Sequence, residues 1–143
     1  MKNLLVVLTL IISSSAFAKV TAIEEKKFVD FFTARDQVIP SVDCNRKTCA
    51  EISIEKLGYV SSDCSKIKND AQDICAAASI EKSGYVYSDC LQLSSGGLCA
   101  EASIKKSGYV YSNCLQISSY RADRCAKASI EKSSYVYSDC LKL

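Results

Sequence analysis

The chain contains a serine and a lysine at a spacing that can support acyl-enzyme chemistry. Ser79-Ile80-Glu81-Lys82 places a serine hydroxyl one helical turn before a lysine amine. A lysine in a water-poor cleft can act there as the base that activates a serine nucleophile. The same S-x-x-K spacing occurs four times, beginning at Ser53, Ser79, Ser103 and Ser129. The motif therefore has to be interpreted together with the repeat that carries it.

Packing explains the S-x-x-K motif better than catalysis does. Lys82-Ser83-Gly84 resembles the K-T-G element of penicillin-recognising enzymes, but it overlaps the serine motif, and one segment cannot form both walls of a cleft. The chain has no histidine, which removes the commonest general base. Acidic side chains do not recur in every copy, because Lys105 and Asn113 stand at two of their positions. We therefore expect no enzymatic activity, and we expect the lysines to be last-turn cations that favour the helix dipole.

Four copies of one 16-residue block make up most of the chain. Each block begins and ends with cysteine, and the starts are 26, 24 and 26 residues apart. Repetition at this period is typical of stacked repeat proteins, in which each unit buries its apolar face against its neighbours. The segments between the blocks vary in length and composition, which predicts loops there. The blocks cover residues 49–64, 75–90, 99–114 and 125–140, and the segments between them cover 65–74, 91–98 and 115–124.

Each block is expected to form a helix followed by a return segment. The first half groups small residues on one side of a helix, and a glycine such as Gly84 follows as a left-handed stop. The second half is ambiguous, because Tyr85-Val86-Tyr87 has strand propensity, whereas helical spacing separates Asp89 from the apolar residues better. We predict an all-α fold of short helical hairpins stacked as a small solenoid, with an α/β repeat of helix and strand as the alternative.

The first 18 residues have the features of a secretory signal peptide. Lys2 precedes an apolar run that is too short to span a membrane, and Ala16-Phe17-Ala18 provides an A-x-A cleavage site. Residues 19–43 follow as a connector, in which residues 22–37 fit an amphipathic helix that would cap the repeat domain at 44–143. No later segment approaches the length of a membrane span. We expect a periplasmic or secreted protein.

All nine cysteines lie after the signal peptide, so an oxidising compartment would let disulfides persist. A hairpin that turns near the glycine of each block would bring the two cysteines of that block together. This scheme pairs Cys49 with Cys64, Cys75 with Cys90, Cys99 with Cys114, and Cys125 with Cys140, and it leaves Cys44 able to join a partner chain.

A rival scheme pairs the cysteines across the segments between the blocks. It joins Cys44 to Cys49 and leaves Cys140 single. The spacing within the blocks never varies, which favours the first scheme. No cysteine pair has the close spacing of a structural zinc site or a C-x-x-C redox motif. We expect no metal and no cofactor.

Tyrosines are the best candidates for binding. They recur in pairs in the last three blocks, and stacking would align them into two rows. Tyrosine offers a large apolar area and a hydroxyl at low entropic cost. We expect one row to be buried between repeats and the other to form a ligand surface. The six residues are Tyr85, Tyr87, Tyr109, Tyr111, Tyr135 and Tyr137.

The formal net charge of +2 is small and does not indicate a nucleic-acid-binding protein. Together these features predict an exported, non-catalytic repeat protein that acts as a binding or structural module for a protein or cell-envelope partner. The alternative is an inhibitor or immunity-like factor that blocks a secreted enzyme. That alternative requires an unusual loop to enter an active site, and residues 91–98 and 118–124 are the candidates.

Overall fold

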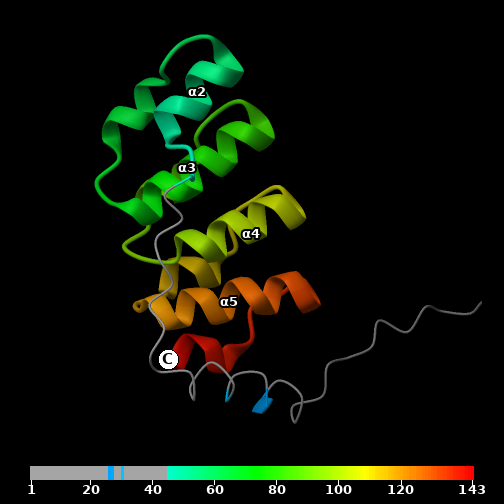
Figure 1. The fold of residues 1–143 in the computed structure, drawn as a ribbon. Helices are drawn as coiled ribbons and strands as arrows, with labels where there is room; N and C mark the ends of the chain where they lie inside the picture. Colours follow the sequence, from blue (N-terminus) through cyan, green and yellow to red (C-terminus); the bar gives the residue numbers. More distant parts are fainter. Residues whose placement is uncertain (1–25, 28–29, 31–44) are drawn as a thin grey trace, which may run out of the picture.

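The computed structural model describes residues 26–27, 30 and 45–143. Between residues 45 and 143 the fold is all-helical and contains no strand (Figure 1). Each α-helix is followed by a short 3₁₀-helix, and we call one such pair a unit. The helices in chain order are α2 (Cys49–Leu57), η1 (Ser62–Lys66), α3 (Asp70–Ser83), η2 (Ser88–Gln92), α4 (Gly97–Ser107), η3 (Ser112–Gln116), α5 (Tyr120–Ser133) and η4 (Ser138–Lys142).

Most of the expected N-terminal features lie outside the described residues. These are the signal peptide at 1–18, Cys44 and the greater part of the expected capping helix at 22–37. Lys26, Lys27 and Asp30 are helical and exposed.

The turn after each α-helix uses a left-handed residue. α3 ends at Gly84, whose φ of 82° carries no Cβ strain in glycine. In the last unit Ser134 takes this position with φ 67°, which costs a residue with a side chain about 1 kcal/mol. The expected glycine stop is therefore present, and a serine is held in the same conformation in the last unit.

The return segment of each unit is a 3₁₀-helix. After Gly84 the chain bends at Tyr85, Tyr87 is extended, and η2 then begins at Ser88. The extended residues form no strand in the part of the chain that the structure describes. The alternative of a helix-and-strand repeat is therefore wrong, and the return helix is shorter and tighter than an α-helix.

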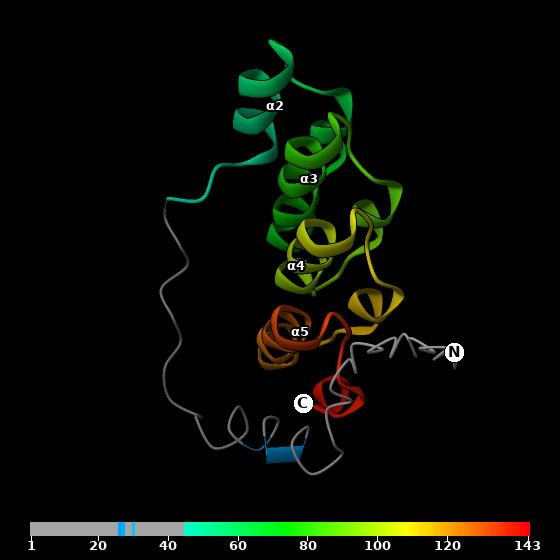
Figure 2. The same ribbon diagram turned by 90° about the vertical axis from the view of Figure 1, so that its right-hand side faces the viewer.

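The units form two layers. Figure 2 shows the α-helices in one layer and the 3₁₀-helices in the other. Consecutive α-helices contact one another, from α2 to α3, from α3 to α4 and from α4 to α5. They run in the same direction, so that their carboxyl ends lie on one side of the molecule, at the right in Figure 1. This packing is compatible with a small helical repeat.

Four disulfides join the two layers. Their Cα–Cα distances lie between 5.3 and 5.7 Å, and seven of the eight bonded cysteines, all but Cys64, are at most 1% exposed. The pairs are those within the blocks, Cys49–Cys64, Cys75–Cys90, Cys99–Cys114 and Cys125–Cys140. Because these eight cysteines are bonded within the chain, the structure does not favour an intermolecular disulfide through them. Four such bonds are consistent with an oxidising compartment.

The isoleucine of the S-x-x-K motif belongs to the hydrophobic core in the last three units. Ile80, Ile104 and Ile130 are at most 1% exposed, whereas Ile54 in the first unit is 54% exposed. The valine between the two tyrosine positions follows the same pattern, because it is buried in the last three units and exposed at Val60. No described unit precedes α2, so the difference follows from the place of each unit in the stack.

The segments between the blocks are not simple loops, which corrects the prediction. α3 begins at Asp70 and α5 at Tyr120, in both cases five residues before the cysteine of the block. Asn69 and Ser119 cap these helices by accepting a backbone N–H with their side chains. Of the proposed inhibitory loops, residues 91–92 and 97–98 belong to helices, and so do residues 120–124. Only short connections remain between the helices.

Carboxylates from one helix cap the start of the previous helix. Asp73 on α3 accepts the N–H of Cys49 at 2.9 Å. Asp123 on α5 accepts the N–H groups of Leu98 and Cys99 at 3.0 and 2.8 Å. Anionic groups stabilise the positive end of the helix dipole. The two aspartates are fifty residues apart, so units 1 and 2 form one pair and units 3 and 4 form a second, similar pair.

A glycine contact joins the two pairs. A Cβ at Gly97 would lie 2.7 Å from the Cα of Ala71, so only a glycine lets the start of α4 approach α3 this closely. The intervening segment that carries Gly97 is also the shortest of the three. The 24-residue offset in the middle of the array therefore marks the junction between the pairs.

Candidate binding surface

The serine of each S-x-x-K motif is buried and bonded to the backbone. Ser79 is 0% exposed, and its hydroxyl donates to the Ala76 carbonyl at 2.9 Å and accepts the Tyr87 N–H at 3.3 Å. This hydroxyl joins α3 to the beginning of η2. The other motif serines, Ser53, Ser103 and Ser129, are equally buried and also bond the backbone of their own return segments.

The lysine of the motif has a different environment from the serine. Lys82 is exposed in the last turn of α3, whereas Ser79 is enclosed. The two side chains therefore do not form a nucleophile and base in an open cleft. This geometry supports the packing interpretation of the motif.

Ser103→Ala is expected to lower the free energy of unfolding by about 1–3 kcal/mol. The reason is that the partly buried Tyr111 N–H would lose its acceptor, the enclosed hydroxyl of Ser103. Urea denaturation followed by circular dichroism measures the effect. Ser112→Ala, at an exposed position of the same unit, is the control and should change stability by less than about 0.5 kcal/mol. Equal stability of the two variants would contradict the proposed role of the serine.

The tyrosines form two rows that differ in exposure. One row follows the left-handed stops and contains Tyr59, Tyr85, Tyr109 and Tyr135, which are 63%, 60%, 59% and 44% exposed. We call it the exposed tyrosine row. In the other row Tyr87 and Tyr111 are partly buried and Tyr137 is 0% exposed. Tyr137 therefore does not belong to a binding surface, which corrects the candidate set, and Tyr59 was missed because the first unit has Ser61 in place of a second tyrosine.

The second row supports the first. The rings of Tyr109 and Tyr111 have centroids 5.2 Å apart, and the corresponding pairs in the second and fourth units have the same separation. The Tyr111 hydroxyl also donates to the Ser134 carbonyl of the next unit at 3.0 Å. Aromatic contacts of this kind add about 0.5–1.5 kcal/mol beyond the burial of area. The three exposed rings that have such a partner are therefore held against the fold.

The exposed tyrosine row lies along one side of the molecule. Each of its members follows the carboxyl end of an α-helix, and these ends lie on the same side in Figure 1. An exposed lysine stands three residues before each ring, at Lys56, Lys82, Lys106 and Lys132. The surface therefore combines aromatic area with ammonium groups.

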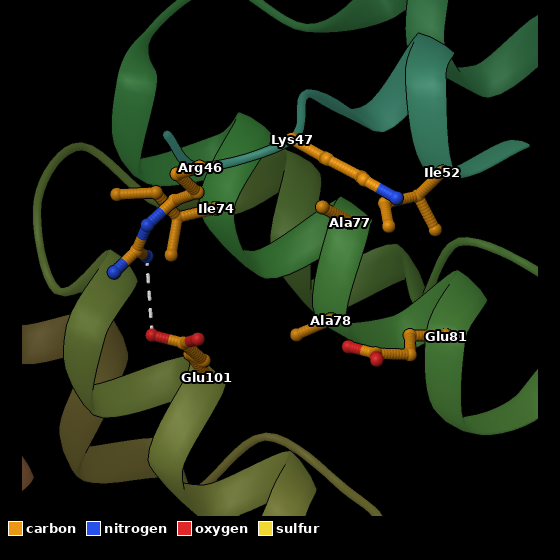
Figure 3. Close-up of a pocket in the computed structure, with 8 residues that line it drawn as sticks. All are labelled: Arg46, Lys47, Ile52, Ile74, Ala77, Ala78, Glu81 and Glu101. Atoms are coloured by element: carbon orange, nitrogen blue, oxygen red, sulfur yellow. Dashed lines mark hydrogen bonds and ion pairs between the residues drawn. The ribbon is translucent and has the colours of Figure 1, made fainter. Parts of the chain in front are cut away.

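A shallow pocket lies between the segment before α2 and helices α2, α3 and α4 (Figure 3). Its volume is about 160 Å³. Its rim is charged and its floor is apolar. The rim residues are Arg46, Lys47, Glu81 and Glu101, and the floor residues are Ile52, Ile74, Ala77 and Ala78. The sequence interpretation missed this pocket, because folding brings together residues as far apart as Arg46 and Glu101 and no local motif marks them.

Ion pairs hold most of the rim. The Arg46 guanidinium donates to Glu101 at 3.1 Å, and Glu101 also accepts from Lys105 at 2.7 Å. Lys47 donates to Glu55 at 2.5 Å. Burial acts to raise the pKa of Glu101, but the hydrogen bond from Lys105 and the nearby positive charges outweigh burial and hold this pKa below its usual value. Glu101 is therefore ionised in the folded chain at neutral pH.

The Glu101 ion pairs predict an acid-sensitive contribution to stability. A carboxyl whose pKa is lowered by folding stabilises the fold above its unfolded pKa of 4.5, and this contribution is lost as the pH falls through the folded pKa. The free energy of unfolding of the wild type should therefore be about 1 kcal/mol higher than that of Glu101→Gln at pH 7. Urea denaturation at several pH values should show this difference shrinking below pH 4.5. A difference that does not depend on pH would contradict the assignment.

The described residues contain no group of three or more histidine, cysteine, aspartate or glutamate side chains that could hold a metal ion. Among the same residues, none of the helices is long and apolar enough to cross a membrane. No family model, curated protein or solved structure matches the chain. The candidate surfaces are therefore the exposed tyrosine row and the pocket.

Proposed function

We propose that the chain is an exported, non-catalytic repeat protein that binds a protein or cell-envelope partner through the exposed tyrosine row. The observation that carries this proposal is the exposure of a tyrosine at the same position of all four units. Tyrosines are enriched among the residues that dominate binding energy at interfaces. Stacking of the units as a small solenoid would place the rings at regular intervals and present them as one extended surface.

Three further features support the proposal. The motif serines are buried in the packing of the units, and the chain has no histidine. A serine nucleophile activated by a histidine base is therefore not available. The first 18 residues have signal-peptide features, and four disulfides suit the periplasm or the extracellular space. The alternative of an inhibitor or immunity-like factor has weaker support, because the connections between helices are too short to form a loop that enters an active site.

Capture of a partner from an envelope extract tests the proposal. The wild type is compared with a variant in which Tyr59, Tyr85, Tyr109 and Tyr135 are all replaced by serine. The matched control replaces the exposed residues Lys66, Gln92 and Gln116 of the 3₁₀-helices by alanine. We expect the control to retain the partner and the tyrosine variant to lose it, with both variants folded by circular dichroism. Retention of the same partner by the tyrosine variant would overturn the proposal.

A further inference from the structure

We propose that the pocket of Figure 3 binds the side chain of a lysine, with its ammonium group on Glu81 and its aliphatic stem over Ala77 and Ala78. The partner that we propose for the exposed tyrosine row would supply this lysine, so the source of the ligand rests on the proposed function. The chemistry of the pocket does not depend on that proposal, because it follows from the residues that line the pocket.

The second pair of units carries a lysine at the position that corresponds to Ala77. Fifty residues after Ala77 and Glu81, the corresponding residues of α5 are Lys127 and Glu131. The Lys127 ammonium lies 4.0 Å from the Glu131 carboxylate, one helical turn away. At Ala77 the side chain ends at Cβ, and a pocket lies in front of Glu81 instead. The chain therefore places a lysine beside this glutamate on α5, and an alanine and a pocket beside it on α3.

The two cations on the rim of the pocket are bonded to carboxylates other than Glu81, so Glu81 can bind a ligand. Arg46 is bonded to Glu101, and Lys47 is bonded to Glu55. Within the part of the chain that the structure describes, no hydrogen bond or ion pair holds the Glu81 carboxylate, and Lys47 acts on it only through space. Figure 3 shows this carboxylate turned toward Ala78. An incoming ammonium group would meet a carboxylate at the edge of the apolar floor.

The floor of the pocket suits the stem of a lysine. Ala77 and Ala78 are 7% and 6% exposed, and Ile52 and Ile74 complete the apolar lining. A lysine side chain buries its methylene groups on apolar surface while its ammonium group stays near water or a counter-ion. Glu81 lies in the last turn of α3, four residues before Tyr85. A partner bound at Tyr85 is therefore the proposed source of the lysine.

Binding of a small lysine analogue tests the proposal without the partner. Nα-acetyl-lysine methylamide is titrated into the ¹⁵N-labelled chain, and amide shifts of residues 77–81 are followed by NMR. We expect saturable shifts with a dissociation constant in the millimolar range. The norleucine analogue, which has the aliphatic stem without the ammonium group, should bind about tenfold more weakly or not at all, because it cannot form the charge-assisted hydrogen bond.

Two variants and a control complete the test. Glu81→Gln removes the carboxylate that would bind the ammonium group. Ala77→Lys introduces a lysine at the position that corresponds to Lys127, where it can pair with Glu81. Each variant should therefore bind the lysine analogue about tenfold more weakly than the wild type. Glu131→Gln changes the equivalent residue of the second pair and should bind like wild type. Absence of saturable shifts, equal binding of the two analogues, or unchanged binding by Ala77→Lys would overturn the proposal. The serine variant of the exposed tyrosine row should still bind the analogue, so failure of the proposed function and failure of this site give different results.

Discussion

Replacing Cys99 and Cys114 together by alanine is expected to lower the free energy of unfolding by about 3 kcal/mol. Their disulfide closes a loop with a sequence separation of 15 residues, and it joins α4 to η3. Without it the unfolded chain gains conformational entropy, and the two layers of the unit lose their covalent link. Reduction of all four bonds should unfold the chain at room temperature, because small domains have only about 5–15 kcal/mol in total. Urea denaturation with and without reductant measures both effects.

The pair Cys49 and Cys64 provides the comparison for this result. It closes a loop with the same sequence separation, but Cys64 is only partly buried. Replacing both cysteines by alanine should therefore lower the free energy of unfolding by a similar entropic contribution, with a smaller loss from packing. If the fully reduced chain kept the denaturation midpoint of the oxidised chain, the conclusion that disulfides stabilise the stack would be wrong.

Ile104→Ala is expected to lower the free energy of unfolding by about 2–5 kcal/mol. Ile104 is 0% exposed and packs between units, so the substitution leaves a cavity in the stack. The equivalent Ile54→Ala should cost less than about 1 kcal/mol, because Ile54 is 54% exposed and no described unit covers it. Thermal denaturation of the two variants in parallel gives the comparison.

The contrast between these two isoleucines tests stacking in particular. Both stand at the same position of the same motif, so intrinsic helix propensity contributes equally to both changes. Only the contact with a preceding unit differs. Equal losses of stability would show that the isoleucine acts within its own unit and not between units.

The features of the fold that follow from local rules could be predicted from the sequence. A glycine such as Gly84 marks the end of a helix because only a left-handed residue closes it there. The constant spacing within each block favoured the pairing of Cys75 with Cys90 and of the other cysteines, which is the pairing in the structure. The small residues around Ser79 indicated a closely packed inner face, and these residues are buried. Each of these features depends on residues of one block.

Features that depend on contacts between distant segments could not be predicted. Propensity did not distinguish an extended Tyr87 followed by a 3₁₀-helix from a regular helix, because the disulfide and the Ser79 hydroxyl determine that path. The exposed tyrosine row could not be distinguished from the less exposed second row, since the two tyrosines of each unit flank the same valine. The pocket could not be predicted because Ala77 has no reactive or charged group that would mark a site. The position becomes informative only when it is compared with Lys127 in the structure.

Site-specific photo-crosslinking tests the proposed binding surface most directly. Benzoylphenylalanine replaces Tyr109 in one variant and Gln116 in the other, and cells that produce each variant are irradiated. Both positions are exposed in the third unit, but Tyr109 lies at the end of α4 and Gln116 lies in η3. We predict one dominant cross-linked partner from position 109 and none from position 116. No adduct at position 109, or the same adduct from both positions, would contradict binding through the exposed tyrosine row.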